Sequence, residues 1–172
     1  MNTSIILTIL ADDHPGIIQT VSSVLQKHGG SWTHSSMSSL AGQFAGILLV
    51  SVPSESSSAC QRELHALESQ GLRIVSHVSM QPAATEETNV FVLDLVGNDR
   101  HGIVHDITTV LSNHDVNVKN LETLVEAASM GGGQLFRARA ELVVPVSADV
   151  DVLERELEDI ANDLMVDISL EK

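Results

Sequence analysis

Hydrophobic residues recur along the chain first with the spacing of strands and then with the spacing of helices. This succession occurs twice. Two runs rich in Ile, Val and Leu, residues 4–10 and 89–96, have the composition of β-strands. Apolar residues at helical spacing follow each run: Ile17, Val21, Val24 and Leu25 in the first half, and Ile103, Ile107, Val110 and Leu111 in the second. Gly29 and Gly30 end the first predicted helix, and residues 113–115 end the second.

The remainder of each half continues the correspondence. Two strands follow the helix, separated by a turn at residues 41–42 in the first half and 130–133 in the second. A second amphipathic helix and a final alternating strand close each half. In the third strand of the second half, Arg137, Arg139 and Glu141 alternate with apolar residues, which predicts one wetter face for that strand.

An internal repeat explains this correspondence. When Asp13 is aligned with Asp99, five further positions are identical: Gly16, Ile17, Val24, Leu25 and His28 fall on Gly102, Ile103, Val110, Leu111 and His114. Each half has the order βαββαβ, which is typical of a ferredoxin-like unit with a four-stranded antiparallel sheet and two helices on one face. We therefore expect an α+β protein with one domain over 1–80, a linker over 81–88 and a second domain over 89–172.

Composition narrows the function. The formal net charge of −14 would repel a phosphate backbone, and aromatic residues make up only 2% of the chain, so direct nucleic-acid binding is not expected. The single cysteine, Cys60, lies at an apolar helix position, cannot form a disulfide within the chain, and favours a reducing cytoplasmic location. The first apolar run is too short to span a membrane, and no motif implies a cofactor.

The stretches ADDHPGIIQTV (11–21) and GNDRHGIVHDI (97–107) join the first strand to the first helix in each copy. As plain connectors, they would use an aspartate as the helix cap and a proline or glycine at the turn. As a binding site, the helix N-terminus would attract an anion, and Asp13 or Asp99 would attract a cation. An α-amino acid carries both charges. Because the loop occurs twice at equivalent positions, we favour the site.

The same residues carry a family resemblance. A βαββαβ unit with Asp-x-Pro-Gly-Ile at this turn, residues 13–17, resembles the ACT domain. Two such units over nearly the whole chain resemble the tandem ACT regulators that include glycine cleavage system transcriptional repressors. The resemblance implies a non-enzymatic regulator that binds a small amino acid such as glycine. It also implies that transcription is controlled through a protein partner, a transcription activator, without direct contact with nucleic acid.

The resemblance carries ligand-binding roles over by position. One site comprises Asp13, His14, Pro15, Gly16 and Ile17, the other comprises Asp99, Arg100, His101, Gly102 and Ile103, and Asn117 and Asn120 at the start of the next strand add polar contacts. Two positions depart from the family's usual Asp-Arg-Pro-Gly: His14 replaces the arginine, and His101 replaces the proline.

Units of about 80 residues bury little surface. The helix-free sheet face or a sheet edge is thus expected to pair, within the chain or in a homodimer.

Other interpretations compete with the sensor. The same fold without a ligand would be a structural or interaction module. His101, His105 and Asp106 suggest a metal site, but no HExxH motif accompanies them. No GxSxG or similar nucleophile motif is present, and the SMGGGQ stretch (129–134) lacks the end of a phosphate loop, so we interpret it as a hairpin tip. The acidic stretch 154–163 is interpreted as a solvated helix face.

Overall fold

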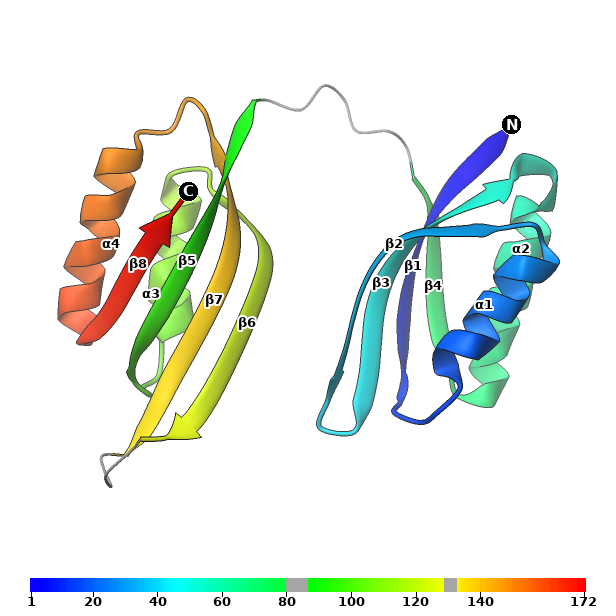
Figure 1. The fold of residues 1–172 in the computed structure, drawn as a ribbon, viewed down its shortest axis with the longest axis horizontal. Helices are drawn as coiled ribbons and strands as arrows, with labels where there is room; N and C mark the ends of the chain where they lie inside the picture. Colours follow the sequence, from blue (N-terminus) through cyan, green and yellow to red (C-terminus); the bar gives the residue numbers. More distant parts are fainter. Residues whose placement is uncertain (80–86, 129–132) are drawn as a thin grey trace. The chain divides into compact units, whose positions relative to one another are not determined.

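A computed structural model describes residues 1–79, 87–128 and 133–172, and the chain divides into two compact units, Met1–Ala83 and Ala84–Lys172 (Figure 1). The first unit contains β1 (Asn2–Asp12), α1 (Ile17–Lys27), β2 (Ser31–Leu40), β3 (Gln43–Pro53), α2 (Ser54–Ala66), the short 3-10 helix η1 (Leu67–Gln70) and β4 (Arg73–Val78). The second contains β5 (Thr88–Asn98), α3 (Ile103–Asn113), β6 (Asn117–Ala127), β7 (Gln134–Pro145), α4 (Val150–Leu164) and β8 (Val166–Glu171).

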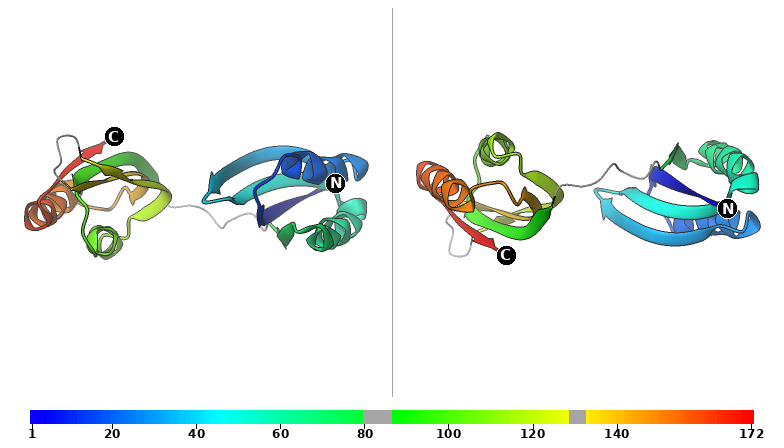
Figure 2. Two further views of the ribbon diagram at one scale, coloured as in Figure 1. Left: turned by 90° about the horizontal axis from the view of Figure 1, so that it is seen from below. Right: turned by 90° about the horizontal axis from the view of Figure 1, so that it is seen from above.

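Each unit forms one four-stranded sheet in which every neighbouring pair of strands is antiparallel. The strand orders are β2-β3-β1-β4 and β6-β7-β5-β8. Within each unit both helices cover the same face of the sheet, and no helix of the described residues covers the other face (Figure 2). The predicted α+β class with two ferredoxin-like units is therefore confirmed.

The boundaries differ from the sequence expectations in two places. The first strand of each unit is longer than its apolar run, because its alternation of inward and outward residues continues to Asp12 and Asn98. Residues 81–86 of the expected linker and 129–132 of the expected hairpin tip lie outside the described residues, and Thr88 already belongs to β5.

A separate apolar core lies between sheet and helices in each unit. In the first unit, alternate residues of β1 such as Ile5, Leu7 and Ile9 are buried against the apolar stripe of α1. Cys60 of α2 belongs to this core, which confirms its expected role. The second unit repeats the arrangement with its own residues from β5, β7, α3 and α4. No helix in the described segments is long and apolar enough to cross a membrane.

The repeated histidines His28 and His114 perform the same structural task. Each follows the C-terminal end of the first helix of its unit and contacts a glutamate of the second helix. The Nε2 atom of His28 lies 2.8 Å from Glu63, which Lys27 also contacts at 2.8 Å, and His114 Nε2 lies 3.0 Å from Glu156. These contacts explain why a histidine occurs at the end of the helix in both halves.

Candidate functional site

The loops at residues 13–16 and 99–102 open onto uncapped helix N-termini. Gly16 and Gly102 precede α1 and α3 with backbone φ angles of 103° and 92°, and among the described residues no side chain caps either helix. The first helical hydrogen bonds run from Thr20 N to Gly16 O and from Asp106 N to Gly102 O, both at 2.9 Å. The N–H groups of the first turn are thus left without a side-chain acceptor in either loop.

The expectation that an aspartate caps the first helix is wrong. Asp13 lies three positions before the N-cap glycine, and its Oδ2 accepts a hydrogen bond from Ser39 Oγ at 2.5 Å. Its neighbour Asp12 accepts one from Gln43 Nε2 at 2.6 Å. The two carboxylates therefore hold the loop against the turn between β2 and β3. A capping role would require the aspartate at the position that Gly16 occupies.

His14, Pro15 and Gly16 are exposed at the tip of the first loop. The ring of His14 is oriented by its Nδ1 atom, which lies 2.8 Å from the carbonyl oxygen of Asp12. The backbone is anchored by Asp13 N, which donates to Gly42 O at 2.9 Å. The exposed residues of this loop thus carry an imidazole and two carboxylates just before the start of α1.

The second loop has the same anchor and a different side-chain arrangement. Asp99 N donates to Gln134 O at 2.8 Å, which matches the first loop. Arg100 Nη1 lies 3.3 Å from the carbonyl oxygen of Asp163 and 3.5 Å from that of Leu164. The guanidinium thereby sits at the negative end of α4. His101 and Gly102 are exposed.

A cavity of about 410 Å³ borders Arg100 between α3 and α4. It is lined by Arg100, His105, Asp106, Thr109, Ile160, Asp163 and Leu164. Asp106 lies in the first turn of α3, where α1 has no acidic residue. Because a carboxylate near a helix N-terminus stabilises the helix and repels a further anion, the second loop is the less favourable place for a ligand carboxylate.

Two of the expected site residues face the core. The side chains of Ile17 and Ile103 are only 3% exposed and belong to the apolar clusters of their units. Their side chains cannot line the loop surface, and only their backbone N–H groups remain at the start of the helix. The helical spacing that identified them as core residues already indicated this.

Asn117 and Asn120 lie far from the loop of their own unit. Asn117 pairs with Val143, which also pairs with Val90 near the start of β5, whereas the loop follows Asn98 at the far end of β5. At about 3.4 Å per residue, the eight residues from Val90 to Asn98 separate them by roughly 27 Å along the strand. The cause is the topology, because β6 runs in the same direction as β5 and starts at the opposite end of the sheet.

Metal-ligating clusters and Ser–His contacts are the other candidate chemistry of the described segments. No group of three or more His, Cys, Asp or Glu side chains in the described segments could hold a metal ion. One Ser–His contact exists, between Ser76 Oγ and His65 Nε2 at 3.0 Å, but the serine hydroxyl donates to Gln61 Oε1 at 3.0 Å. With its proton committed to the glutamine, Ser76 is not arranged as an activated nucleophile.

Comparison with known proteins relates the first unit to a sequence family and the whole chain to solved structures. Residues 3–77 match the sequence model of the ACT domain. The solved structure of an unknown protein from Galdieria sulphuraria is 27% identical, covers 99% of this chain and 98% of its own, and superposes with a TM-score of 0.89. The structure of a candidate glycine cleavage system transcriptional repressor is 16% identical over 99% and 97% of the two chains, with a TM-score of 0.69. No curated protein matches the chain. Residues 3–77 of the first unit therefore have the ACT sequence pattern, and the second unit repeats the same strand order.

Proposed function

We propose that the protein is a regulator that responds to a small amino acid bound at the strand-to-helix loops. The observation that carries the proposal is the repeated left-handed glycine before an uncapped helix in an ACT fold. The carboxylate of the ligand would accept hydrogen bonds from the first-turn N–H groups, and its ammonium group would lie near Asp13 or Asp99. Because Asp106 disfavours an anion at α3, we expect the loop of the first unit to bind more tightly.

The size of the ligand bounds its affinity. Glycine has five heavy atoms, and the best very small ligands reach about −1.5 kcal/mol per atom, so its binding free energy cannot exceed about −7.5 kcal/mol. That value corresponds to a Kd in the low micromolar range at best. The protein would therefore sense a metabolite pool at micromolar to millimolar concentration.

Regulation would be exerted through another protein. The net charge of −14 disfavours contact with nucleic acid, and the chain shares the fold of a candidate glycine cleavage system transcriptional repressor. We propose a cytoplasmic protein that controls transcription by binding a partner such as a transcription activator, and that pairs as a homodimer. In such a pair, Asn117 and Asn120 could contribute only to the loop of another unit, because they are far from their own.

Thermal stability in the presence of individual amino acids tests the sensor. A ligand at 100 times its Kd should stabilise the folded protein by about 2.7 kcal/mol. A Cβ atom at Gly16 would meet no other atom within 4 Å, so Gly16→Asn adds a side chain at the loop without a clash at Cβ, although the φ of 103° strains any side chain there. Asparagine tolerates the left-handed conformation. The variant should lose the response to ligand.

Gly29→Asn is the matched control. Gly29 also has a positive φ, of 68°, and lies just beyond the other end of α1. This variant should respond to ligand like the wild type. If millimolar concentrations of every amino acid leave the wild-type melting temperature unchanged, the sensor proposal is wrong.

A structural or interaction module is the second candidate. The bonds from Ser39 to Asp13 and from Gln43 to Asp12 use the loop carboxylates to support the fold, which is what a connector would do. This candidate predicts a stable complex with a partner in a pull-down and no response to amino acids. Partner binding should then survive substitutions at Gly16 and Gly102.

A further inference from the structure

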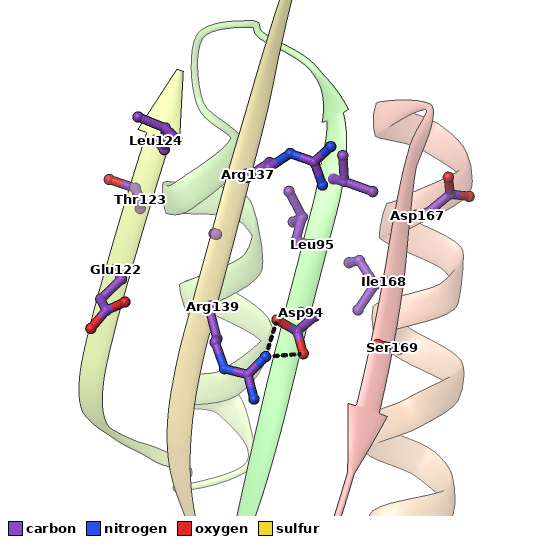
Figure 3. Close-up of a pocket in the computed structure, with 12 residues that line it drawn as sticks. Asp94, Leu95, Glu122, Thr123, Leu124, Arg137, Arg139, Asp167, Ile168 and Ser169 are labelled. Atoms are coloured by element: carbon purple, nitrogen blue, oxygen red, sulfur yellow. Dashed lines mark hydrogen bonds and ion pairs between the residues drawn. The ribbon is translucent and has the colours of Figure 1, made fainter. Parts of the chain in front are cut away.

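The helix-free face of the second sheet contains a cavity of about 610 Å³ (Figure 3). This volume lies within the range of about 300–1,000 Å³ that is usual for small-molecule sites. Its walls come from β5, β6, β7 and β8, and it includes none of the loop residues discussed above. The wetter face that the alternation of Arg137 and Arg139 predicts for β7 is the one that borders this cavity.

Charged side chains cross the sheet in two adjacent rows. In one row Glu122, Arg139, Asp94 and Ser169 are direct cross-strand neighbours, and in the next row Leu124, Arg137, Val96 and Asp167 occupy the same strands. Figure 3 shows both arginine side chains reaching from β7 over β5. The two guanidinium groups thus lie on one wall of the same cavity, with carboxylates on the flanking strands.

Ion pairs hold these arginines and leave donors available. Arg139 Nη1 lies 3.1 Å from each carboxylate oxygen of Asp94, and Arg137 Nε donates to Glu126. In the described part of the chain, Arg139 donates through Nη1 alone and Arg137 through Nε alone. The other guanidinium N–H groups can donate hydrogen bonds to a ligand carboxylate without breaking either ion pair, which is the preorganised arrangement that favours binding.

The charge of the lining restricts the class of ligand. The cavity is bordered by the cations Arg137 and Arg139 and by the carboxylates of Asp94, Glu122 and Asp167, an excess of one negative charge. A simple anion such as phosphate or a dicarboxylate would be repelled by this excess. A ligand with both a carboxylate and an ammonium group matches both kinds of side chain.

The first unit shows that the fold does not require these charges. Its β3 strand carries Ala45 and Ile47 at the positions that correspond by register to Arg137 and Arg139, and its β1 strand carries Thr8 in place of Asp94. Both sheets have the same topology, so the charged rows are a property of the second unit alone among the described residues.

We propose that this cavity binds a free α-amino acid, whose carboxylate contacts Arg137 and Arg139 and whose ammonium group contacts Asp167 or Glu122. The site goes beyond the proposed loop site, since it lies on another face of the unit and uses different residues. A tandem ACT protein with both sites would bind amino acids in two chemically distinct places.

Isothermal titration of the full-length protein with single amino acids tests the site. Arg137→Ala and Arg139→Ala, made separately, should each raise the Kd for at least one amino acid by about tenfold or more, because each removes charge-assisted hydrogen bonds. Arg155→Ala is the matched control, because Arg155 is exposed on α4 and donates to the carbonyl oxygen of Asp151. Its affinities should equal those of the wild type. The arginine Nε–Hε signals in NMR spectra should shift with the same ligands.

The loop variants separate this proposal from the proposed function. If Gly16→Asn and Gly102→Asn abolish all binding while both arginine variants keep the wild-type Kd, the cavity proposal is overturned and the loop site stands. If the arginine variants lose binding that the loop variants retain, the cavity proposal is supported. Binding of succinate or phosphate as tight as that of an amino acid, or no binding of any amino acid to the wild type, would also overturn it.

Discussion

Replacing Gly97 by alanine should destabilise the second unit strongly. Gly97 lies in β5 directly opposite Val166 of β8. A Cβ atom at position 97 would lie 2.7 Å from Val166 Cβ and 2.9 Å from Val166 Cα. Opposed Cβ atoms in antiparallel strands are normally about 4.5–5.5 Å apart. The two strands approach too closely here for any side chain at position 97, so the variant must push β8 away from β5.

The expected loss is large because the clash involves backbone as well as side-chain atoms. Overpacking costs about 1–3 kcal/mol, and we expect about 3 kcal/mol here. A domain of this size loses about 4–8 °C of melting temperature per kcal/mol, so the transition of the second unit should fall by about 12–24 °C. Trp32, the one tryptophan of the chain, lies in β2, so its fluorescence follows the first unit while circular dichroism follows both.

The melting temperature of the second unit, followed by circular dichroism, should therefore fall. The melting temperature of the first unit, followed by Trp32 fluorescence, should not change. Adding Val166→Ala to Gly97→Ala should recover part of the loss, because it removes Val166 Cγ1, the atom nearest the new methyl group. A Gly97→Ala variant that melts like the wild type would refute the close approach of β5 and β8.

Two further predictions concern titratable groups of the first unit. Hydrogen bonds from Lys27 and then His28 lower the pKa of Glu63 below its ordinary value of 4.5, so the stability that this carboxylate contributes should be present above pH 4.5 and be lost as the pH falls through the lowered pKa. In urea unfolding, Glu63→Gln should remove this loss of stability at low pH. A variant whose stability still falls at low pH as in the wild type would contradict the prediction. Burial is the main cause that raises the pKa of the Cys60 thiol, and the charge of Glu63 is the second. Cys60 should consequently react slowly with iodoacetamide in the native protein and rapidly in urea, and equal rates would contradict its burial.

The order of elements and the positions of the loops could be predicted from the sequence because their signals are local. Apolar spacing changes from strand to helix period at Asp13 and Asp99, and the predicted helix ends at residues 29–30 and 113–115 lie within one residue of, or include, the observed C-caps His28 and His114. The repeat strengthened each assignment, because the same signal appeared at two equivalent places. The inward direction of Ile17 followed from the same helical spacing.

Contacts between distant segments decided which side chains share a site. Strand direction separated Asn117 from the loop after Asn98, although both lie at the borders of strands in the sequence. Arg100 contacts carbonyl oxygens of α4 more than sixty residues away, which no local pattern indicated.

The sequence alone therefore determined the two βαββαβ units, their cores and the acidic character, since periodicity, turn residues and charge are properties of neighbouring residues. Only the tertiary structure decided that Asp13 supports a hairpin instead of capping α1, and that Arg137 and Arg139 border a cavity with Asp94 and Asp167. The physical reason is that hydrogen-bond partners and charge neighbours are set by cross-strand register and helix packing, which join segments far apart along the chain.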